Sequence, residues 1–107
     1  MVNPYTGEVA IRLDGVAHVM KLTLGALAEL ETALDAPSLI DLVERFEAGR
    51  FSTRDVLALV VAGLRGGGWT GCAADLLQVD IGGGPVEAAR AAAELLARAF
   101  QVPSGAP

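Results

Sequence analysis

The chain has 107 residues, of which 52% are hydrophobic and 20% are charged. This length suffices for one compact domain and is too short for two, and the apolar content excludes intrinsic disorder for most of the chain. A single cysteine and a single histidine exclude an internal disulfide and the usual four-ligand zinc site, so we expect no metal and no cofactor. The net charge of −5 argues against a general nucleic-acid binder.

Neither the start of the chain nor its apolar segments indicate membrane targeting. Residues 1–5 lack the cationic and apolar regions of a signal peptide. The longest apolar run, Val56 to Leu64, is far shorter than the roughly 20 residues needed to cross a bilayer. We therefore expect a cytoplasmic protein with no membrane contact, folded as a single domain over residues 1–102 with a flexible tail at 103–107.

Residues 8–22 predict a β-hairpin. Apolar and polar residues alternate with the period of two that a half-buried strand requires. Asp14-Gly15 favours a two-residue turn with positive φ at both positions. The pairs that such a turn predicts are Leu13 with Val16, Ile11 with His18, and Val9 with Met20. This arrangement places His18 on the apolar face, which the following helices must cover.

Five helices are predicted after the hairpin, at residues 24–34, 38–48, 53–65, 72–78 and 85–101. Thr23 is a suitable N-cap, and Ser38 and Ser52 each precede an aspartate by three residues, as in a capping box. Pro85 suits the first position of the last helix. Two triglycine segments, at 66–68 and 82–84, separate the helices and indicate either hinges or points of tight packing. The predicted fold class is α+β, mainly α, with an N-terminal β-hairpin packed on a bundle of four to five short helices.

The spacing of apolar residues predicts which face each helix buries. The predicted stripe of the first helix is Leu24, Leu27, Leu30 and Leu34. That of the second is Leu39, Leu42, Val43 and Phe46, and that of the last is Val86, Ala89, Ala93, Leu96 and Phe100. The third helix is apolar on most sides, which is typical of a central helix or of one shared with another chain. Its candidate self-association residues are Leu57, Val60, Val61 and Leu64, and we expect a homo-oligomer.

Residues 29–47 contain six carboxylates and a single cation, Arg45, and so carry the whole net negative charge. Such a stretch forms either a solvated surface or a docking face for a basic partner. Trp69, which lies among glycines, is either an anchor for a partner or a lid over the end of the core. The candidate partner-binding residues are Glu29, Glu31, Asp41, Glu44, Glu47 and Trp69.

No catalytic site is apparent from the sequence. The glycines of Gly66-x-Gly68-x-x-Gly71 match a dinucleotide-binding spacing, but they follow a predicted helix, whereas that motif requires a strand before it. Cys72 would need His18, on the apolar face of the hairpin, as its base. We therefore expect an interaction protein without enzymatic activity.

Short segments over residues 3–68 resemble, in order and spacing, a family of small proteins from bacterial gene transfer agents and related long-tailed phages. The segments are Asn3-Pro4-x-x-Gly7-Glu8-Val9, Leu13-Asp14-Gly15, Lys21-x-Thr23, Leu27-Ala28-Glu29-Leu30-Glu31, Ser38-Leu39-x-x-Leu42, and Asp55 followed by Gly63-Leu64-Arg65. The resemblance implies a role in building the tail of a phage-like particle. The family is grouped with tail assembly chaperones, which coat the tape measure protein before the tail tube polymerises around it, and has also been described as a tube component.

These two roles imply the tape measure protein or the tail tube protein, or both, as partners. A tube subunit of known tails is a β-sandwich, and this chain has too few strand signals for one. We therefore favour a chaperone in the cytoplasm of the cell that makes the particle. Retention of the protein in the finished particle is the alternative location. A small helical regulatory or antitoxin-like protein that binds a basic partner is the alternative from another class.

Overall fold

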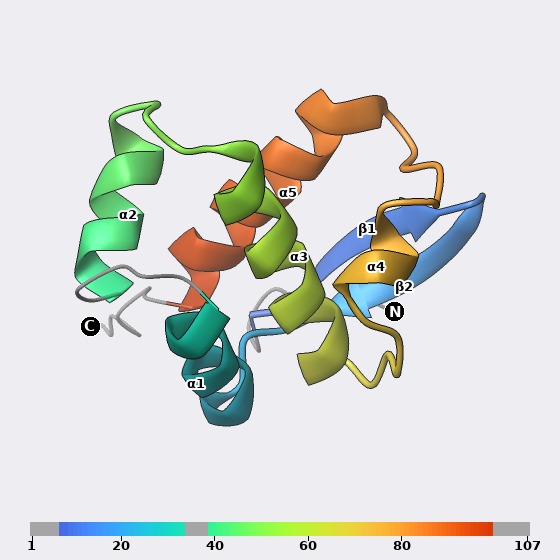
Figure 1. The fold of residues 1–107 in the computed structure, drawn as a ribbon, viewed down its shortest axis with the longest axis horizontal. Coiled ribbons are helices and arrows are strands. Elements are labelled where there is room, and N and C mark those ends of the chain that lie inside the picture. The colour runs from blue at the N-terminus through green and yellow to red at the C-terminus, as the bar shows by residue number, and fades with distance from the viewer. Residues whose placement is uncertain (1–6, 34–38, 100–107) are drawn as a thin grey trace, which may run out of the picture.

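The computed structural model describes residues 7–33 and 39–99. Two antiparallel strands, β1 (Val9–Leu13) and β2 (Val16–Met20), precede the helices. The helices are α1 (Leu24–Ala33), α2 (Leu39–Glu47), α3 (Thr53–Gly66), α4 (Ala73–Leu76) and α5 (Gly84–Ala99). Figure 1 shows α3 in the middle of the molecule, between α1, α5 and the hairpin. The predicted α+β, mainly α fold with an N-terminal hairpin is confirmed.

The hairpin has the predicted register. Val9 pairs with Met20, Ile11 with His18 and Leu13 with Val16. The turn residues Asp14 and Gly15 have φ values of 52° and 81°, the positive values that such a tight turn requires. One face of the hairpin is buried, through Val9, Ile11, Leu13 and Met20.

A segment between α4 and α5 adds a short stretch of sheet to β1, which the sequence did not predict. Leu13 and Ile81 form an isolated antiparallel bridge. The Asp14 N–H donates to the Asp80 carbonyl oxygen at 2.7 Å, and the Gly82 N–H donates to the Arg12 carbonyl oxygen at 3.1 Å. These bonds occupy the outer edge of β1 near the turn, so the α4–α5 connection is fixed to the hairpin.

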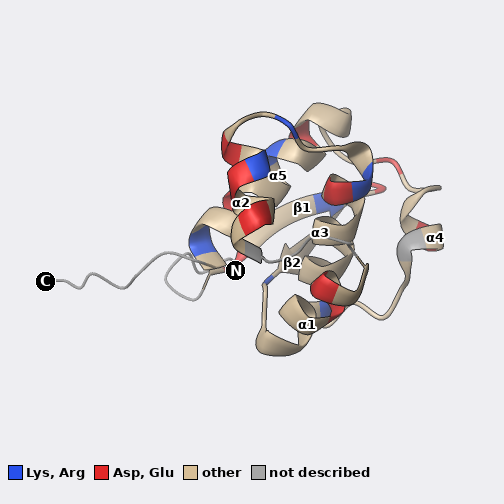
Figure 2. Ribbon diagram, turned by 60° about the vertical axis from the view of Figure 1, so that its left-hand side comes forward, with Lys and Arg blue, Asp and Glu red and all other residues tan. Residues whose placement is uncertain are grey.

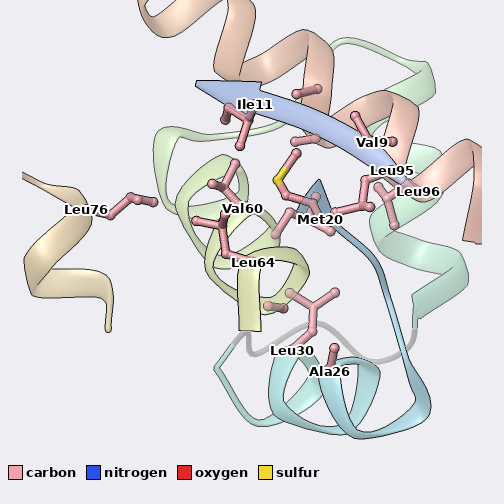
Figure 3. Close-up of a cluster of buried hydrophobic side chains, with 14 of the residues drawn as sticks. Val9, Ile11, Met20, Ala26, Leu30, Val60, Leu64, Leu76, Leu95 and Leu96 are labelled. Atoms are coloured by element: carbon pink, nitrogen blue, oxygen red, sulfur yellow. The ribbon is translucent and has the colours of Figure 1, made fainter. Parts of the chain in front are cut away.

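α3 supplies much of the core (Figure 3). Its capping box is present as predicted: the Ser52 hydroxyl accepts from the Asp55 N–H, and the Asp55 carboxylate accepts from the Ser52 N–H. Leu59 and Leu64 are fully buried and Val60 is 1% exposed. A helix that is apolar on most sides therefore finds its partners within this chain.

Glycines let α3 approach the hairpin closely. A Cβ on Gly66 would overlap the Lys21 carbonyl oxygen, and one on Gly67 would overlap the Val19 carbonyl oxygen. The Lys21 N–H donates to the Gly63 carbonyl oxygen at 2.8 Å, which closes part of the outer edge of β2. The first triglycine segment is therefore a point of tight packing, one of its two predicted roles.

The predicted faces of the first and last helices need correction. On α1, Leu30 is buried as predicted, but Leu24 is 85% exposed and Ala26 is buried in its place. Val86 is 81% exposed, and α5 buries Ala88, Ala91, Ala92, Leu95 and Leu96. These faces combine the leucines with alanines, whose small side chains allow close approach between backbones. The predictions for Leu34, Ser38 and Phe100 concern residues outside the described ranges.

The Thr23 cap is confirmed, since its hydroxyl accepts from the Ala26 N–H at 3.1 Å. Gly49 has a φ of 72° just after α2, as a left-handed helix exit requires. Within the ranges 7–33 and 39–99, no helix has the length and apolar character to cross a membrane.

Candidate partner-binding groove

An open apolar groove with a volume of about 580 Å³ lies between α3, α4 and the first turns of α5. Its floor is formed by Val60, Leu76 and Ala88, all of which are buried. Three large apolar side chains of its lining remain exposed: Phe51 at 36%, Leu77 at 72% and Val86 at 81%. Exposed apolar side chains that gather around one hollow are typical of an interaction site.

Local structure explains why this groove stays open. α4 is a single turn, capped by the Asp75 carboxylate, which accepts from the Cys72 N–H at 3.0 Å. α5 begins after Gly83, and Gly83 and Gly84 have φ values of 85° and 73°. A short helix and a glycine-rich connection cover little surface. α3 and α5 are therefore left with an incompletely covered side beside α4.

Asp80 is the one residue with an ionisable side chain among the described residues that line the groove. Its backbone is held by the hairpin turn: its carbonyl oxygen accepts from the Asp14 N–H, and its own N–H donates to Asp14 Oδ1 at 2.9 Å. The Asp80 residue is exposed, and no described side chain forms an ion pair with its carboxylate. The groove thus combines apolar walls with one acidic residue whose backbone is held in place.

The predicted acidic face is divided in the folded chain. Glu29 and Glu31 belong to α1, whereas Asp41, Glu44 and Glu47 belong to α2, and Figure 2 shows these two groups at separate places. Glu29 forms an ion pair with Arg65 at 3.2 Å. Glu31, Glu44 and Glu47 are exposed, with no ion pair to any described residue. Unneutralised charge therefore remains on both helices.

Arg45, the single cation of the acidic stretch, connects α2 to α3. Its guanidinium lies 3.3 Å from the Asp55 carboxylate, whose side chain is 3% exposed, and its Nε lies 3.9 Å from Asp41. The Arg45 Nε is buried without a hydrogen-bond partner. The sequence identified Asp55 as a capping residue but did not predict its ion pair with Arg45. The available signal was that Arg45 is the single cation among six carboxylates in residues 29–47.

Trp69 lies apart from the apolar groove, in a polar depression that Thr23, Glu29 and Arg65 also line. The Trp69 residue is half-buried, and its N–H donates to the Leu64 carbonyl oxygen at 2.9 Å. Its indole ring occupies the space where a Cβ on Gly71 would lie. The structure thus brings two predicted partner-binding residues, Trp69 and Glu29, to one place and separates them from α2.

The candidate self-association residues divide into two groups. Val60 and Leu64 are 1% and 0% exposed and pack inside their own chain, and Val60 also forms part of the floor of the apolar groove. Leu57 is half-buried and lines the apolar groove. Val61 is half-buried and lines a smaller depression between α1 and α3, to which Leu57 also contributes.

The groove-lining residues that the sequence did not single out include Phe51, just before α3. Three others, Leu77, Val79 and Ile81, follow α4. They form a short alternating apolar run between the two glycine segments, and that run was the available signal. The glycines of the dinucleotide-like spacing lie at the end of α3, without the strand that precedes the helix in that motif. Within the described part of the chain, no group of three His, Cys, Asp or Glu residues could hold a metal ion.

The chain matches the family model described as "Phage tail tube protein, GTA-gp10" over residues 6–102. The chain belongs to this phage tail family. No curated protein and no solved structure matches it significantly. The match covers both the hairpin and the groove, and it confirms the resemblance to the gene transfer agent and phage tail family. It gives the protein a phage tail-related role in a family of structural phage tail proteins.

Proposed function

We propose that the protein is a tail assembly chaperone of a phage-like particle, either a gene transfer agent or a prophage. In this role it binds an apolar helical segment of the tape measure protein before tail-tube polymerisation. The observation that carries the proposal is the apolar groove with its exposed Phe51, Leu77 and Val86. A helix docked by its apolar stripe would cover all three side chains, as in helix-in-groove recognition.

The size of the groove suits a few anchoring side chains. Its volume of about 580 Å³ lies within the range of roughly 300–1,000 Å³ that is usual for binding pockets. A tape measure protein is long, so several copies of a small chaperone would each cover one segment. Burial of the apolar stripe supplies the affinity in this proposal, at about 25 cal/mol for each Å² removed from water.

The acidic face of α2 has a supporting role in the proposal. Glu44 and Glu47 are exposed and form no ion pair with any described residue. Unpaired charges of one sign raise the rate of encounter with a basic partner. Association should therefore slow as salt rises, while dissociation from the apolar groove changes little.

The second candidate is a structural component of the tail tube, and the description of the family favours it. A ring built by pairing of sheets needs open strand edges. In this chain the outer edge of β1 is bonded to residues 80–82 near the turn, and Lys21, just after β2, is bonded to Gly63. These contacts support the chaperone over the tube component, and no observation favours the regulatory or antitoxin-like alternative.

Co-expression with the tape measure protein of the same gene cluster tests the proposal. We expect a soluble complex of the two proteins and an aggregated tape measure when it is expressed alone. Purified particles provide the second measurement, by quantitative mass spectrometry. A tape measure that is equally soluble alone, together with this protein in stoichiometric amounts in every tube ring, would establish the tube component instead.

A further inference from the structure

We propose that the groove selects a partner segment in which a lysine or arginine flanks the apolar stripe, and that Asp80 is the residue that selects it. The inference rests on the proposed function for the groove, and it specifies the charge of the partner segment that binds there. Its support is the placement of one unpaired carboxylate in an otherwise uncharged apolar lining. A basic side chain is the group that complements this charge.

The position of Asp80 is fixed by the fold. Two hydrogen bonds join it to Asp14, one through its carbonyl oxygen at 2.7 Å and one through its N–H at 2.9 Å. The second bond uses Oδ1 of Asp14, so two carboxylate residues lie next to each other at the edge of the groove. Because the backbone is held, the charge of Asp80 is presented to an occupant without ordering a loop first.

The neighbouring cations leave this carboxylate unneutralised. The stem of Arg12 packs along Gly82, yet Arg12 forms no ion pair with any described carboxylate. Arg90, on the first turns of α5, is engaged by Glu87 and Glu94. Asp75 on α4 adds a further negative charge near this side of the groove and accepts from Cys72. The carboxylates of Asp14, Asp75 and Asp80 outnumber Arg12, the one nearby cation without an ion pair to a described residue. An occupant with a basic flank is therefore attracted, and one with an acidic flank meets repulsion.

Two synthetic helical peptides provide the probes. Both carry the same leucine stripe at positions i, i+3, i+4 and i+7; one has lysines beside the stripe and the other has glutamates. Binding to the full-length protein is measured by fluorescence anisotropy at low and at high salt. We expect the lysine peptide to bind several-fold more tightly at low salt, with the preference reduced at high salt.

Three variants assign the preference to Asp80. Asp80→Asn keeps the shape of the side chain and should weaken the preference, and Asp80→Lys should weaken it further or reverse it, although the carboxylates of Asp14 and Asp75 remain. Ala28→Lys makes the same change in net charge as Asp80→Asn at an exposed position of α1, away from the groove, and should leave most of the preference intact. Thermal melts of each variant confirm that the fold is kept.

Each remaining outcome overturns the inference. Equal binding of both peptides, or a preference that Ala28→Lys alters as much as Asp80→Asn does, removes Asp80 as the selecting residue. No binding of either peptide shows that the groove does not accept an apolar helix. If Leu77→Glu converts an oligomer of the protein alone into a monomer in sedimentation, the occupant is a second copy of the chain. The proposed function is tested separately, by whether co-expression changes the solubility of the tape measure protein.

Discussion

The two sides of α3 are built differently. Toward the hairpin, its glycines and the alanine face of α5 bring backbones into close contact, and Met20 and Leu95 fill the remaining space without exposure. Beside α4, the same helix borders a groove whose apolar lining includes Leu77 and Val86, both mostly exposed. One sequence thus combines a close-packed side, where substitutions should cost stability, with an open side, where they should cost binding.

The largest effect should come from charging the packed side. Ile11→Asp places an unpaired carboxylate at a position that is 4% exposed, and we expect a loss of several kcal/mol in the free energy of unfolding. Val16→Asp, in the same hairpin but at a position 58% exposed, is the matched control. Thermal melts that place Ile11→Asp within a degree or two of the wild type would show that the hairpin does not lie on the core.

Glycine substitutions should separate close packing from helix propensity. Gly66→Ala adds a Cβ that would overlap the Lys21 carbonyl oxygen, and we expect destabilisation by about 1–3 kcal/mol. Gly25→Ala, in an open position of α1, should stabilise the chain by about 0.5–1 kcal/mol. Urea titration measures both values. Similar changes for the two variants would contradict the close approach of α3 to the hairpin.

Removal of the α3 cap should have an intermediate effect. Ser52→Ala deletes the hydroxyl that accepts from the Asp55 N–H at 3.1 Å, and such caps contribute about 1 kcal/mol. Ser52 also lines the groove, so the variant shows whether this residue contributes to stability, to binding, or to both. We expect lower stability in chemical denaturation with peptide binding kept, and a variant that loses binding alone would place Ser52 in the partner contact.

The smallest effect should be pH dependence on the exposed face of α5. Hydrogen bonds from the Arg90 guanidinium lower the pKa of Glu87. A lowered pKa contributes stability above the usual glutamate pKa of about 4.3, and this contribution is lost as pH falls through the lowered value. The difference in Tm between wild type and Glu87→Gln should therefore be small and positive at pH 7 and vanish in acid. A difference that grows on acidification would contradict this ion pair.

Local signals in the sequence were sufficient to predict the hairpin and the helix caps. The turn at Asp14-Gly15 determines the register, and Thr23 and Ser52 cap the helices they precede. The buried faces of α1 and α5 could not be predicted in the same way. Hydrophobic spacing favoured the large Leu24 and Val86, whereas the fold uses alanines where the backbones approach closely.

The groove was harder to predict because its parts are distant in sequence. Phe51, Leu77 and Val86 precede α3, follow α4 and begin α5, and only tertiary packing brings them together. The bridge between Leu13 and Ile81 holds the α4–α5 connection, which contains Asp80. A single bridge leaves no periodic pattern in the sequence from which it could be predicted. The acidic stretch was visible in sequence, but its division between α1 and α2 depends on where the helices pack.

The central claim is that the open side of α3 is a binding surface and not a weak part of the core. The most direct measurement is the double variant Leu77→Ser/Val86→Ser, assayed for stability and for solubilisation of the tape measure protein. Both side chains are more than two-thirds exposed, so we expect a free energy of unfolding within about 0.5 kcal/mol of wild type. We expect the tape measure protein to aggregate when co-expressed with it. A destabilised variant, or one that keeps the tape measure soluble, would contradict the claim.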